Sequence, residues 1–197
     1  MKGIIACVVL VAAVAVSEAA SGKLGMLRHS SLGHCPNITN KQDLEIGPYL
    51  GYWFELERFN IIFEFGMDCV HAIYTDLGEG VVEVHNIART LLGTPSEIIG
   101  TAVVKEPGVL TVEFSGYIPA EYHVLDTDYT TFSAVYNCVQ IGPERFQYAW
   151  ILARSPSLDQ DTYDHARAVF ESNGIDLSLF HSTYQGDDCP GNPGRAI

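Results

Sequence analysis

The chain has 197 residues and a formal net charge of −13, from 11 Lys and Arg against 24 Asp and Glu with the histidines neutral. This length suits one domain with short processing segments. The acidic balance argues against nucleic acid as a partner and against polybasic attachment to an anionic membrane, because both need clustered Lys and Arg. A hydrophobic content of 47% excludes a disordered acidic tail. We therefore expect a folded acidic protein whose partner is not a polyanion.

Residues 1–19 have the pattern of a secretory signal peptide. Lys2 precedes the apolar run 4–16, which is too short to span a bilayer, and Ser17 and Ala19 are small residues at the cleavage positions. We predict cleavage after Ala19 and a secreted, extracellular protein; the alternative is a buried N-terminal helix. Residues 20–34 are rich in Gly and Ser without periodicity, so we expect a flexible arm.

Cysteine usage agrees with export. Cys7 leaves with the leader, and the remaining four are Cys35, Cys69, Cys138 and Cys189. An even number in an oxidising compartment predicts two disulfides, although spacing alone leaves three pairings open. No pair has the CxxC spacing of a zinc site, so we expect no metal. Asn37 begins an Asn-Ile-Thr sequon, which predicts glycosylation.

Eight short runs with strand chemistry, separated by turn signals, occupy most of the mature chain. They cover residues 52–59, 69–76, 81–90, 96–106, 109–115, 122–126, 131–138 and 146–153. Their short connections predict a meander of antiparallel hairpins. Eight such strands can close on themselves, which removes exposed sheet edges. We therefore predict an all-β fold, an eight-stranded antiparallel up-and-down barrel.

One amphipathic helix is expected after the strands. Ser157 is the candidate N-cap, and Asp159 and Asp161 complement the positive end of the helix dipole. The apolar stripe of this helix consists of Tyr163, Ala166, Val169 and Phe170. Asn173 and Gly174 end the helix. A helix with one apolar stripe packs on the outside of the barrel, and residues 175–189 then return as an extended tail.

Alternation along the strands separates an inward face from an outward one. The inward set is apolar and aromatic with a few polar tips, including Asn86 and Trp150, which is typical of a cavity for one small ligand. The alternative is a solid core in which the polar tips satisfy one another. On the strand 131–138, the residues assigned to the inward set are Phe132, Ala134 and Tyr136.

Three separated motifs resemble the conserved regions of the lipocalin family. Gly51 and Trp53 open the first strand, Thr127-Asp128-Tyr129 lies between the sixth and seventh, and Arg154 follows the eighth. In that family the Trp plugs the closed end of the barrel and the Arg lies across its ring. The resemblance implies these roles for Trp53 and Arg154. No other inward Lys or Arg is evident, which favours a neutral ligand over a fatty acid.

Longer stretches resemble the branch of this family that contains apolipoprotein D and its invertebrate relatives. They are residues 35–37, 49–57, 127–129, 135–138 and 149–156. The resemblance implies a lipocalin domain over residues 35–190, followed by a short tail at 191–197. It also implies the disulfides Cys35–Cys138 and Cys69–Cys189.

This resemblance further implies a ligand-binding calyx and no cofactor. The pocket positions of this branch correspond to Tyr74, Asn86, Tyr122 and Trp150. The alternation along the strands adds four apolar wall residues, Val84, Val112, Phe114 and Tyr136. The expected ligand is a small hydrophobic molecule such as a sterol, retinoid, lipid or pigment. A carotenoid or bilin carrier is the variant that some relatives suggest.

The segment 61–65 carries four large apolar residues in a loop at the open end of such a barrel. They are Ile61, Ile62, Phe63 and Phe65. Exposed apolar residues of this kind predict a lid over the ligand, or a patch for lipid, lipoprotein or a second subunit. The alternative is that the loop folds into the barrel mouth.

Three classes of function compete. A carrier of a small hydrophobic molecule leads. An enzyme is disfavoured, because the resemblance gives all four mature cysteines expected disulfide partners and the histidines lack a metal-binding spacing. An interaction protein, with the barrel as scaffold and the apolar mouth as binding surface, would be favoured by a solid core.

Overall fold

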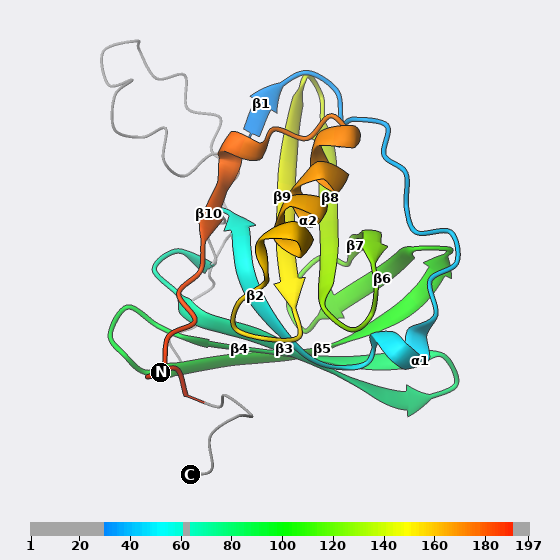
Figure 1. Ribbon diagram of the computed structural model, residues 1–197. Helices are drawn as coiled ribbons and strands as arrows, with labels where there is room; N and C mark the ends of the chain where they lie inside the picture. The colour runs from blue at the N-terminus through cyan, green and yellow to red at the C-terminus, as the bar shows by residue number, and fades with distance from the viewer. Residues whose placement is uncertain (1–29, 61–63, 191–197) are drawn as a thin grey trace, which may run out of the picture.

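The computed structural model describes residues 30–60 and 64–190. Eight consecutive strands pair in chain order, and the last pairs with the first, so the sheet closes into a barrel (Figure 1). The strands are β2 (Gly51–Phe59), β3 (Asp68–Gly78), β4 (Val81–Arg89), β5 (Pro95–Glu106), β6 (Val109–Phe114), β7 (Ala120–Thr127), β8 (Phe132–Ile141) and β9 (Glu144–Ala153). All of these pairings are antiparallel. The predicted eight-stranded antiparallel barrel is confirmed.

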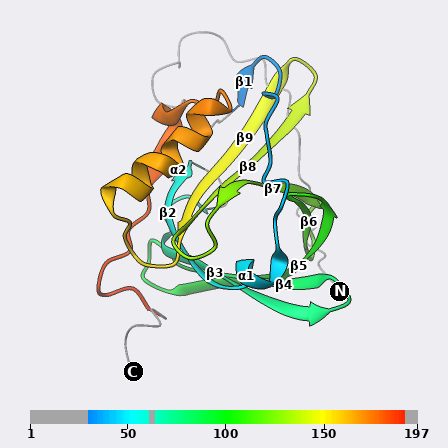
Figure 2. The ribbon, with the colours of Figure 1, turned by 45° about the vertical axis from the view of Figure 1, so that its right-hand side comes forward.

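Because the strands alternate in direction, their connections alternate between two ends of the barrel. We call the end with the β3–β4, β5–β6 and β7–β8 connections the closed end, and the other the open end. The short helix α1 (Ile46–Tyr49) lies at the closed end (Figure 2). The sequence did not predict α1, since four residues are too few to show a helical period.

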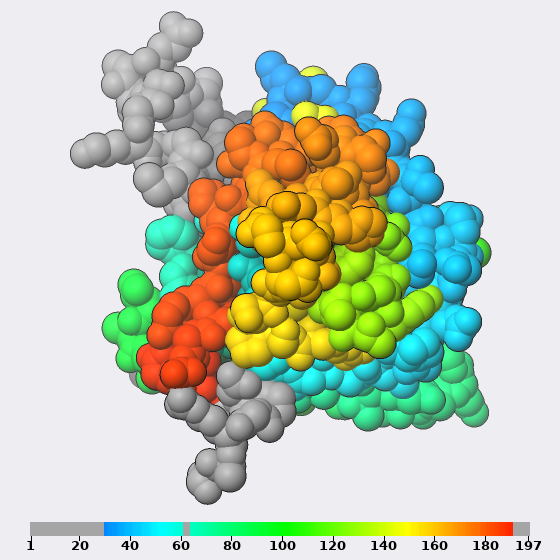
Figure 3. Space-filling model, in the orientation of Figure 1, coloured from blue at the N-terminus to red at the C-terminus, as the bar shows by residue number. Residues whose placement is uncertain are grey.

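The helix α2 (Gln160–Ser172) packs outside the barrel against β7 and β8, as predicted (Figures 1 and 3). Its N-cap is Asp159, whose side chain accepts a hydrogen bond from the backbone N–H of Thr162 at 3.0 Å. The prediction that Ser157 caps the helix was therefore wrong. Ala166 and Phe170 are fully buried, which fits the predicted apolar stripe.

Two apolar clusters result, one inside the barrel and one between α2 and the outer barrel wall. β8 contributes residues to both clusters. Val135 packs in the interior cluster, whereas Phe132, Ala134 and Tyr136 pack in the cluster beneath α2. Their assignment to the inward face was wrong. Alternation of apolar and polar residues cannot identify the inner face of a strand that is buried on both sides.

The segments that flank the barrel are tied to it. Residues 30–34 were expected to belong to a flexible arm, yet β1 (Ser30–Leu32) pairs with β9. After α2 come the 3-10 helix η3 (Leu177–Leu179) and β10 (Phe180–Ser182), which pairs with β2. The disulfides Cys35–Cys138 and Cys69–Cys189 are both present and span 103 and 120 residues. Within the described ranges, no helix has the length and apolar character needed to cross a membrane.

Candidate functional site

The barrel interior holds an apolar cluster that includes six of the eight residues predicted to bind ligand. These six are Tyr74, Val84, Val112, Phe114, Tyr122 and Trp150. Asn86 is half-buried and shares the inner face of β4 with Val84 by alternation. Tyr136 lies in the other cluster, where its hydroxyl donates to Gln147 at 2.8 Å. The predicted ligand contacts are therefore gathered in one place, with Tyr136 excluded.

Trp53 and Arg154 close one end of this interior. Trp53 is completely buried, and its indole N–H donates to the backbone oxygen of Tyr49 in α1 at 2.9 Å. The Arg154 guanidinium lies 3.6 Å from the centroid of the Trp53 ring. Gly51 has a φ of +92°, and a Cβ there would come within 3.5 Å of the guanidinium. That distance is an ordinary van der Waals contact, so it is the positive φ, which side-chain-bearing residues rarely adopt, that requires glycine at the start of the strand.

The guanidinium of Arg154 also binds the backbone around it. Its N–H groups donate to the carbonyl oxygens of Pro48, Leu50, Tyr52 and Tyr129 at 2.7–2.9 Å. These carbonyls come from α1, the start of β2 and the β7–β8 connection. Burial lowers the pKa of Arg154, but a guanidinium stays charged in proteins. One side chain therefore joins three segments across the closed end.

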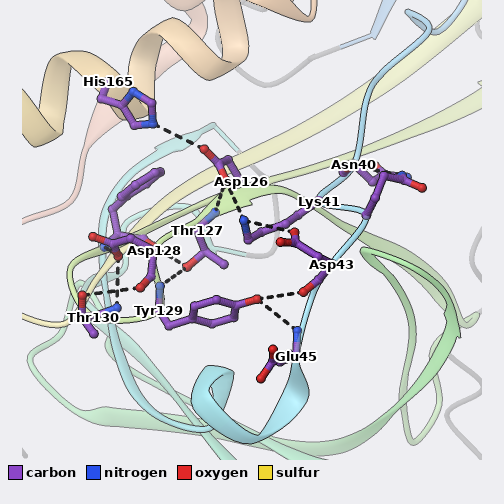
Figure 4. Close-up of polar contacts among 12 residues, drawn as sticks. Asn40, Lys41, Asp43, Glu45, Asp126, Thr127, Asp128, Tyr129, Thr130 and His165 are labelled. Atoms are coloured by element: carbon purple, nitrogen blue, oxygen red, sulfur yellow. Dashed lines mark hydrogen bonds and ion pairs between the residues drawn. The ribbon is translucent and has the colours of Figure 1, made fainter.

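The motif Thr127-Asp128-Tyr129 forms the corner between β7 and β8 (Figure 4). The Thr127 hydroxyl donates to the carbonyl of Phe132 at 2.6 Å and accepts from the N–H of Tyr129 at 2.9 Å. Burial opposes ionisation of Asp128, but hydrogen bonds from Thr131 and its neighbours outweigh it and lower the Asp128 pKa. Tyr129, at a φ of +67°, donates its hydroxyl to the carbonyl of Asp43. This corner is structural, since its polar groups bind the backbone.

A chain of four hydrogen-bonded hydroxyl groups crosses the interior near the closed end. Tyr49 lies 2.8 Å from Ser133 and 3.0 Å from Tyr122, and Tyr122 lies 3.0 Å from Tyr74. Burial raises the pKa of Tyr49 to about 12 and also raises those of Tyr74 and Tyr122. The chain is therefore neutral at physiological pH. Tyr49 is a member that the sequence analysis missed, because it belongs to the unpredicted α1.

The interior wall is less completely buried toward the open end. Asn86, Val112, Phe114 and Trp150 are half-buried there, whereas Trp53 and Val124 lower down are inaccessible. On β5 the wall is lined by a glycine: a Cβ at Gly100 would lie 2.5 Å from the ring of Phe114. The Phe114 side chain thus takes the space above Gly100. The interior is therefore sealed at one end and partly accessible at the other, and we call this arrangement of side chains the cup.

A charged group at the open end was also missed. A bulge in β2 between Glu55 and Glu57 breaks the strand alternation, so Arg58 lies on the same side as Glu55 and pairs with it. Arg58 also faces Glu64 from the following connection. We call Glu55, Arg58 and Glu64 the mouth cluster. The expectation that Arg154 is the one inward cation was therefore wrong, because parity cannot anticipate a bulge.

Other predicted features fall outside this cup. Asn37 is exposed on the segment before α1. Phe65 is exposed near the open end, while Ile61, Ile62 and Phe63 lie outside the described residues. A hollow of about 240 Å³ lies at the closed end between α1 and the β3–β4 turn, away from the predicted ligand contacts. In residues 30–60 and 64–190, no three potential metal-ligating side chains gather.

Comparisons with known proteins match this geometry. The family model described as a lipocalin-like domain matches residues 44–185. Apolipoprotein D of Macaca fascicularis is 36% identical over 164 residues, covering 81% of this chain and 86% of its own. Lobster apocrustacyanin A1 superimposes with a TM-score of 0.75 at 20% identity, over 82% of this chain and 93% of its own. Insecticyanin of the tobacco hornworm Manduca sexta gives a TM-score of 0.72 at 22% identity, over 83% and 93%.

Proposed function

Because the chain belongs to the lipocalin family, we propose that it is a secreted carrier that binds one small hydrophobic molecule inside the barrel. The observation that carries this proposal is the cup: an apolar interior, sealed by Trp53 and Arg154 and half-buried toward the open end. Carriers of this family are generally not enzymes. The barrel therefore serves as a container.

The polar groups of the interior favour a neutral ligand, for example a sterol, a retinoid or a neutral lipid. Arg58 and Arg154 are engaged by carboxylates or backbone carbonyls. The hydroxyl chain can donate to or accept from one carbonyl or hydroxyl of a ligand. Burying about 300 Å² of apolar ligand surface would contribute roughly 7 kcal/mol before the entropy of binding is subtracted. Because a 1 μM dissociation constant corresponds to about 8 kcal/mol, tight binding needs further contacts, such as a hydrogen bond to the hydroxyl chain.

Ligand binding is testable through Trp150, which stands in the half-buried wall. We expect retinoids, sterols or carotenoids to quench its fluorescence, and Trp150→Phe to remove most of that signal. Tyr136→Phe is the matched control, because Tyr136 lies in the α2 cluster and should not change the affinity. A panel without any quenching would refute the carrier proposal. Mass spectrometry of protein from its natural source would identify the ligand and test the pigment-carrier variant.

Export and glycosylation are part of the proposal. Two disulfides and the similarity to apolipoprotein D support an extracellular protein. We expect the secreted chain to begin at Ala20 and to carry a glycan on the exposed Asn37. Sequencing the secreted N-terminus tests the first expectation. A mass shift on glycosidase treatment, absent in Asn37→Gln, tests the second.

A second candidate function is docking to lipid or lipoprotein through the open end, and exposed apolar side chains favour it. Leu91 and Leu92 in the β4–β5 connection are 83% and 89% exposed, and Ile118 in the β6–β7 connection is 91% exposed. Phe65, from the predicted segment 61–65, lies at the same end and is also exposed. Binding of Leu91→Ser/Leu92→Ser/Ile118→Ser to zwitterionic vesicles, compared with the parent, tests this candidate.

A further inference from the structure

The barrel wall is incomplete between β2 and β3 toward the open end. The ladder joins residues 51–54 of β2 to residues 71–74 of β3, although both strands continue beyond it. β2 has its bulge directly after this ladder, and β3 shifts its register against β4 directly before it. Such irregularities bend a strand and end its pairing. We call the stretches that do not pair with each other in the described chain, residues 55–59 of β2 and 68–70 of β3, the seam.

Residues 183–189 of the C-terminal segment, which we call the strap, fill the seam and lie at the surface beside β2 (Figures 1 and 3). On the β2 side, the strap follows β10, and the N–H of Thr183 donates to the carbonyl of Leu56 at 2.8 Å. On the β3 side, the N–H of Cys69 donates to a carbonyl of the strap at 2.8 Å. The disulfide between Cys69 and Cys189 fixes the end of the strap. The strap therefore stands where further rungs of the β2–β3 ladder would be.

Gln185 joins the two strands at the point where they separate. Its side-chain Nε2 donates to the carbonyl of Glu55 at 2.8 Å and to that of Val70 at 2.6 Å. These two residues come next to the last rung of the ladder, in which Phe54 lies opposite His71. One half-buried side-chain amide thus takes the place of the next rung. Opening this junction breaks hydrogen bonds of the strap and no ladder between the eight barrel strands, so it needs only a local rearrangement.

The strap around Gln185 forms a compact loop that is held to β3 and β4. The Tyr184 ring packs so closely over Gly186 that a Cβ there would overlap it, and the Tyr184 hydroxyl donates to Asp188 at 2.6 Å. Arg89, the last residue of β4, binds the Asp188 carboxylate at 2.8 Å. On the other side, the ladder between β10 and β2 holds the start of the strap. These two attachments keep the strap on the barrel and limit how far the seam can widen.

The inner side of the seam faces the ligand-binding wall. The buried Thr183 hydroxyl donates to Glu55 and accepts from Arg58, at 3.1 Å, in the mouth cluster. Arg58 is the cross-strand neighbour of Trp150, which packs against the interior cluster. A widened seam would therefore give an apolar molecule a lateral path past Arg58 to Trp150.

We propose that the seam is a lateral gate through which the ligand enters and leaves the barrel, and that Gln185 is the contact that closes it. This inference rests on the proposed function, because it concerns access to the same barrel interior. The rates of association and dissociation are then both proportional to the fraction of molecules whose seam is open. The affinity depends on the closed protein, which remains the major state. Weakening the contact of Gln185 therefore speeds exchange of the ligand in both directions and leaves the affinity unchanged.

Stopped-flow fluorescence with retinol tests the gate through Gln185→Ala. We expect the association and dissociation rates of retinol to rise together by about tenfold, the equivalent of one lost hydrogen bond, at a constant dissociation constant. A contact that merely stabilises the bound state would raise the dissociation rate alone and weaken the affinity. Gln140→Ala is the matched control, because the Gln140 amide also binds backbone carbonyls at the open end, but at the β8–β9 connection. Its rates should equal those of the parent.

Amide hydrogen exchange of the ligand-free protein tests the closing contact without a ligand. The N–H groups of Thr183 and Cys69, which hold the strap to the two sides of the seam, should exchange about tenfold faster in Gln185→Ala. The amides of the β8–β9 ladder should keep the exchange rates of the parent. Unchanged exchange at the seam, or retinol rates that do not rise together, would overturn the proposal. If the seam amides respond but retinol binds to neither protein, the result contradicts carriage of retinol and supports Gln185 as the closing contact.

Discussion

The two ends of the barrel differ in how their residues are held. At the closed end, Arg154 covers Trp53 and binds backbone carbonyls from three segments. At the open end, Leu91 and Ile118 project into solvent, and a buried cluster carries more acid than base. The Arg154 guanidinium at the first end is satisfied by backbone carbonyls. The second end leaves apolar side chains exposed and, among the described residues, one buried carboxyl oxygen of Glu64 without a hydrogen bond.

This difference separates stability from function within one sheet. A barrel that must admit an apolar molecule needs one end whose contacts can be exchanged for contacts with the ligand. Hydrogen bonds to backbone and full burial make the other end rigid. Substitutions at the closed end should therefore change the free energy of unfolding, and substitutions at the open end should change binding.

The largest effect is expected from Trp53→Ala. Removing a fully buried indole leaves a cavity beneath Arg154 and should reduce the free energy of unfolding by about 3–5 kcal/mol. Urea denaturation measures this loss. A loss below about 1 kcal/mol would mean that the closed end does not carry the stability assigned to it.

Replacing both Cys69 and Cys189 by Ser should cost about 2–4 kcal/mol, because the bridge closes a loop of 120 residues in the unfolded chain. This bridge ties the C-terminal segment to the start of β3, beside the open end. We therefore expect ligand affinity to fall together with stability. Denaturation and retinol titration of the same variant check the two effects, and unchanged affinity would show that the tail does not support the cup.

The pH dependence of stability distinguishes the ends in another way. Burial, and then the charge of Glu55, raise the pKa of Glu64 in the folded protein, so its contribution to stability is fully present below the unfolded-state pKa and is lost as the pH rises through about 8. Between these values the free energy of unfolding should fall with pH, by at most about 1.4 kcal/mol per unit for this group. Glu64→Gln should show a flatter profile, whereas Glu113→Gln, which alters an exposed glutamate on the outer face of β6, should follow the parent. Identical profiles in all three proteins would contradict the expectation.

Tyr74→Phe removes the end of the hydroxyl chain. We expect a change in stability of about 1 kcal/mol, the net value of one buried hydrogen bond. If the chain orients the ligand, affinity should fall roughly tenfold for a ligand with a carbonyl or hydroxyl and stay unchanged for its hydrocarbon analogue. Equal losses for both ligands would indicate that Tyr74 contributes packing alone.

The smallest effect on stability is expected from Leu91→Ser/Leu92→Ser/Ile118→Ser. These side chains are almost fully exposed, so the free energy of unfolding should stay within about 0.5 kcal/mol of the parent. Association with zwitterionic vesicles should nevertheless fall if the open end docks to lipid. Ile99→Ser, which alters an exposed side chain on the outer wall at β5, is the matched control.

The inner face of a strand could be predicted from the alternation of apolar and polar residues wherever only one face of the strand is buried. On β4, Val82 and Val84 alternate with Glu83 and His85, and the structure has the same inner face. On β8 the rule failed, since α2 buries the outer face too and Tyr136 meets apolar neighbours on the side away from the cup. The helix cap moved from Ser157 to Asp159 because several polar residues in that turn could serve.

By itself, the amino-acid sequence determined that this protein folds as a barrel with one external helix and two disulfides. These features depend on the periodicity of apolar residues along the chain, on turn residues and on short motifs that resemble those of a known family. Only the tertiary structure decided that Tyr49 joins the hydroxyl chain and that a bulge turns Arg58 toward Glu55. It also decided that Glu64 is buried with them. Such contacts join residues through the closure of the barrel, and no one-dimensional pattern records which buried charges will meet. The −13 net charge argued against a polyanionic partner, but it gave no sign of the three titratable side chains that are buried near the barrel mouth.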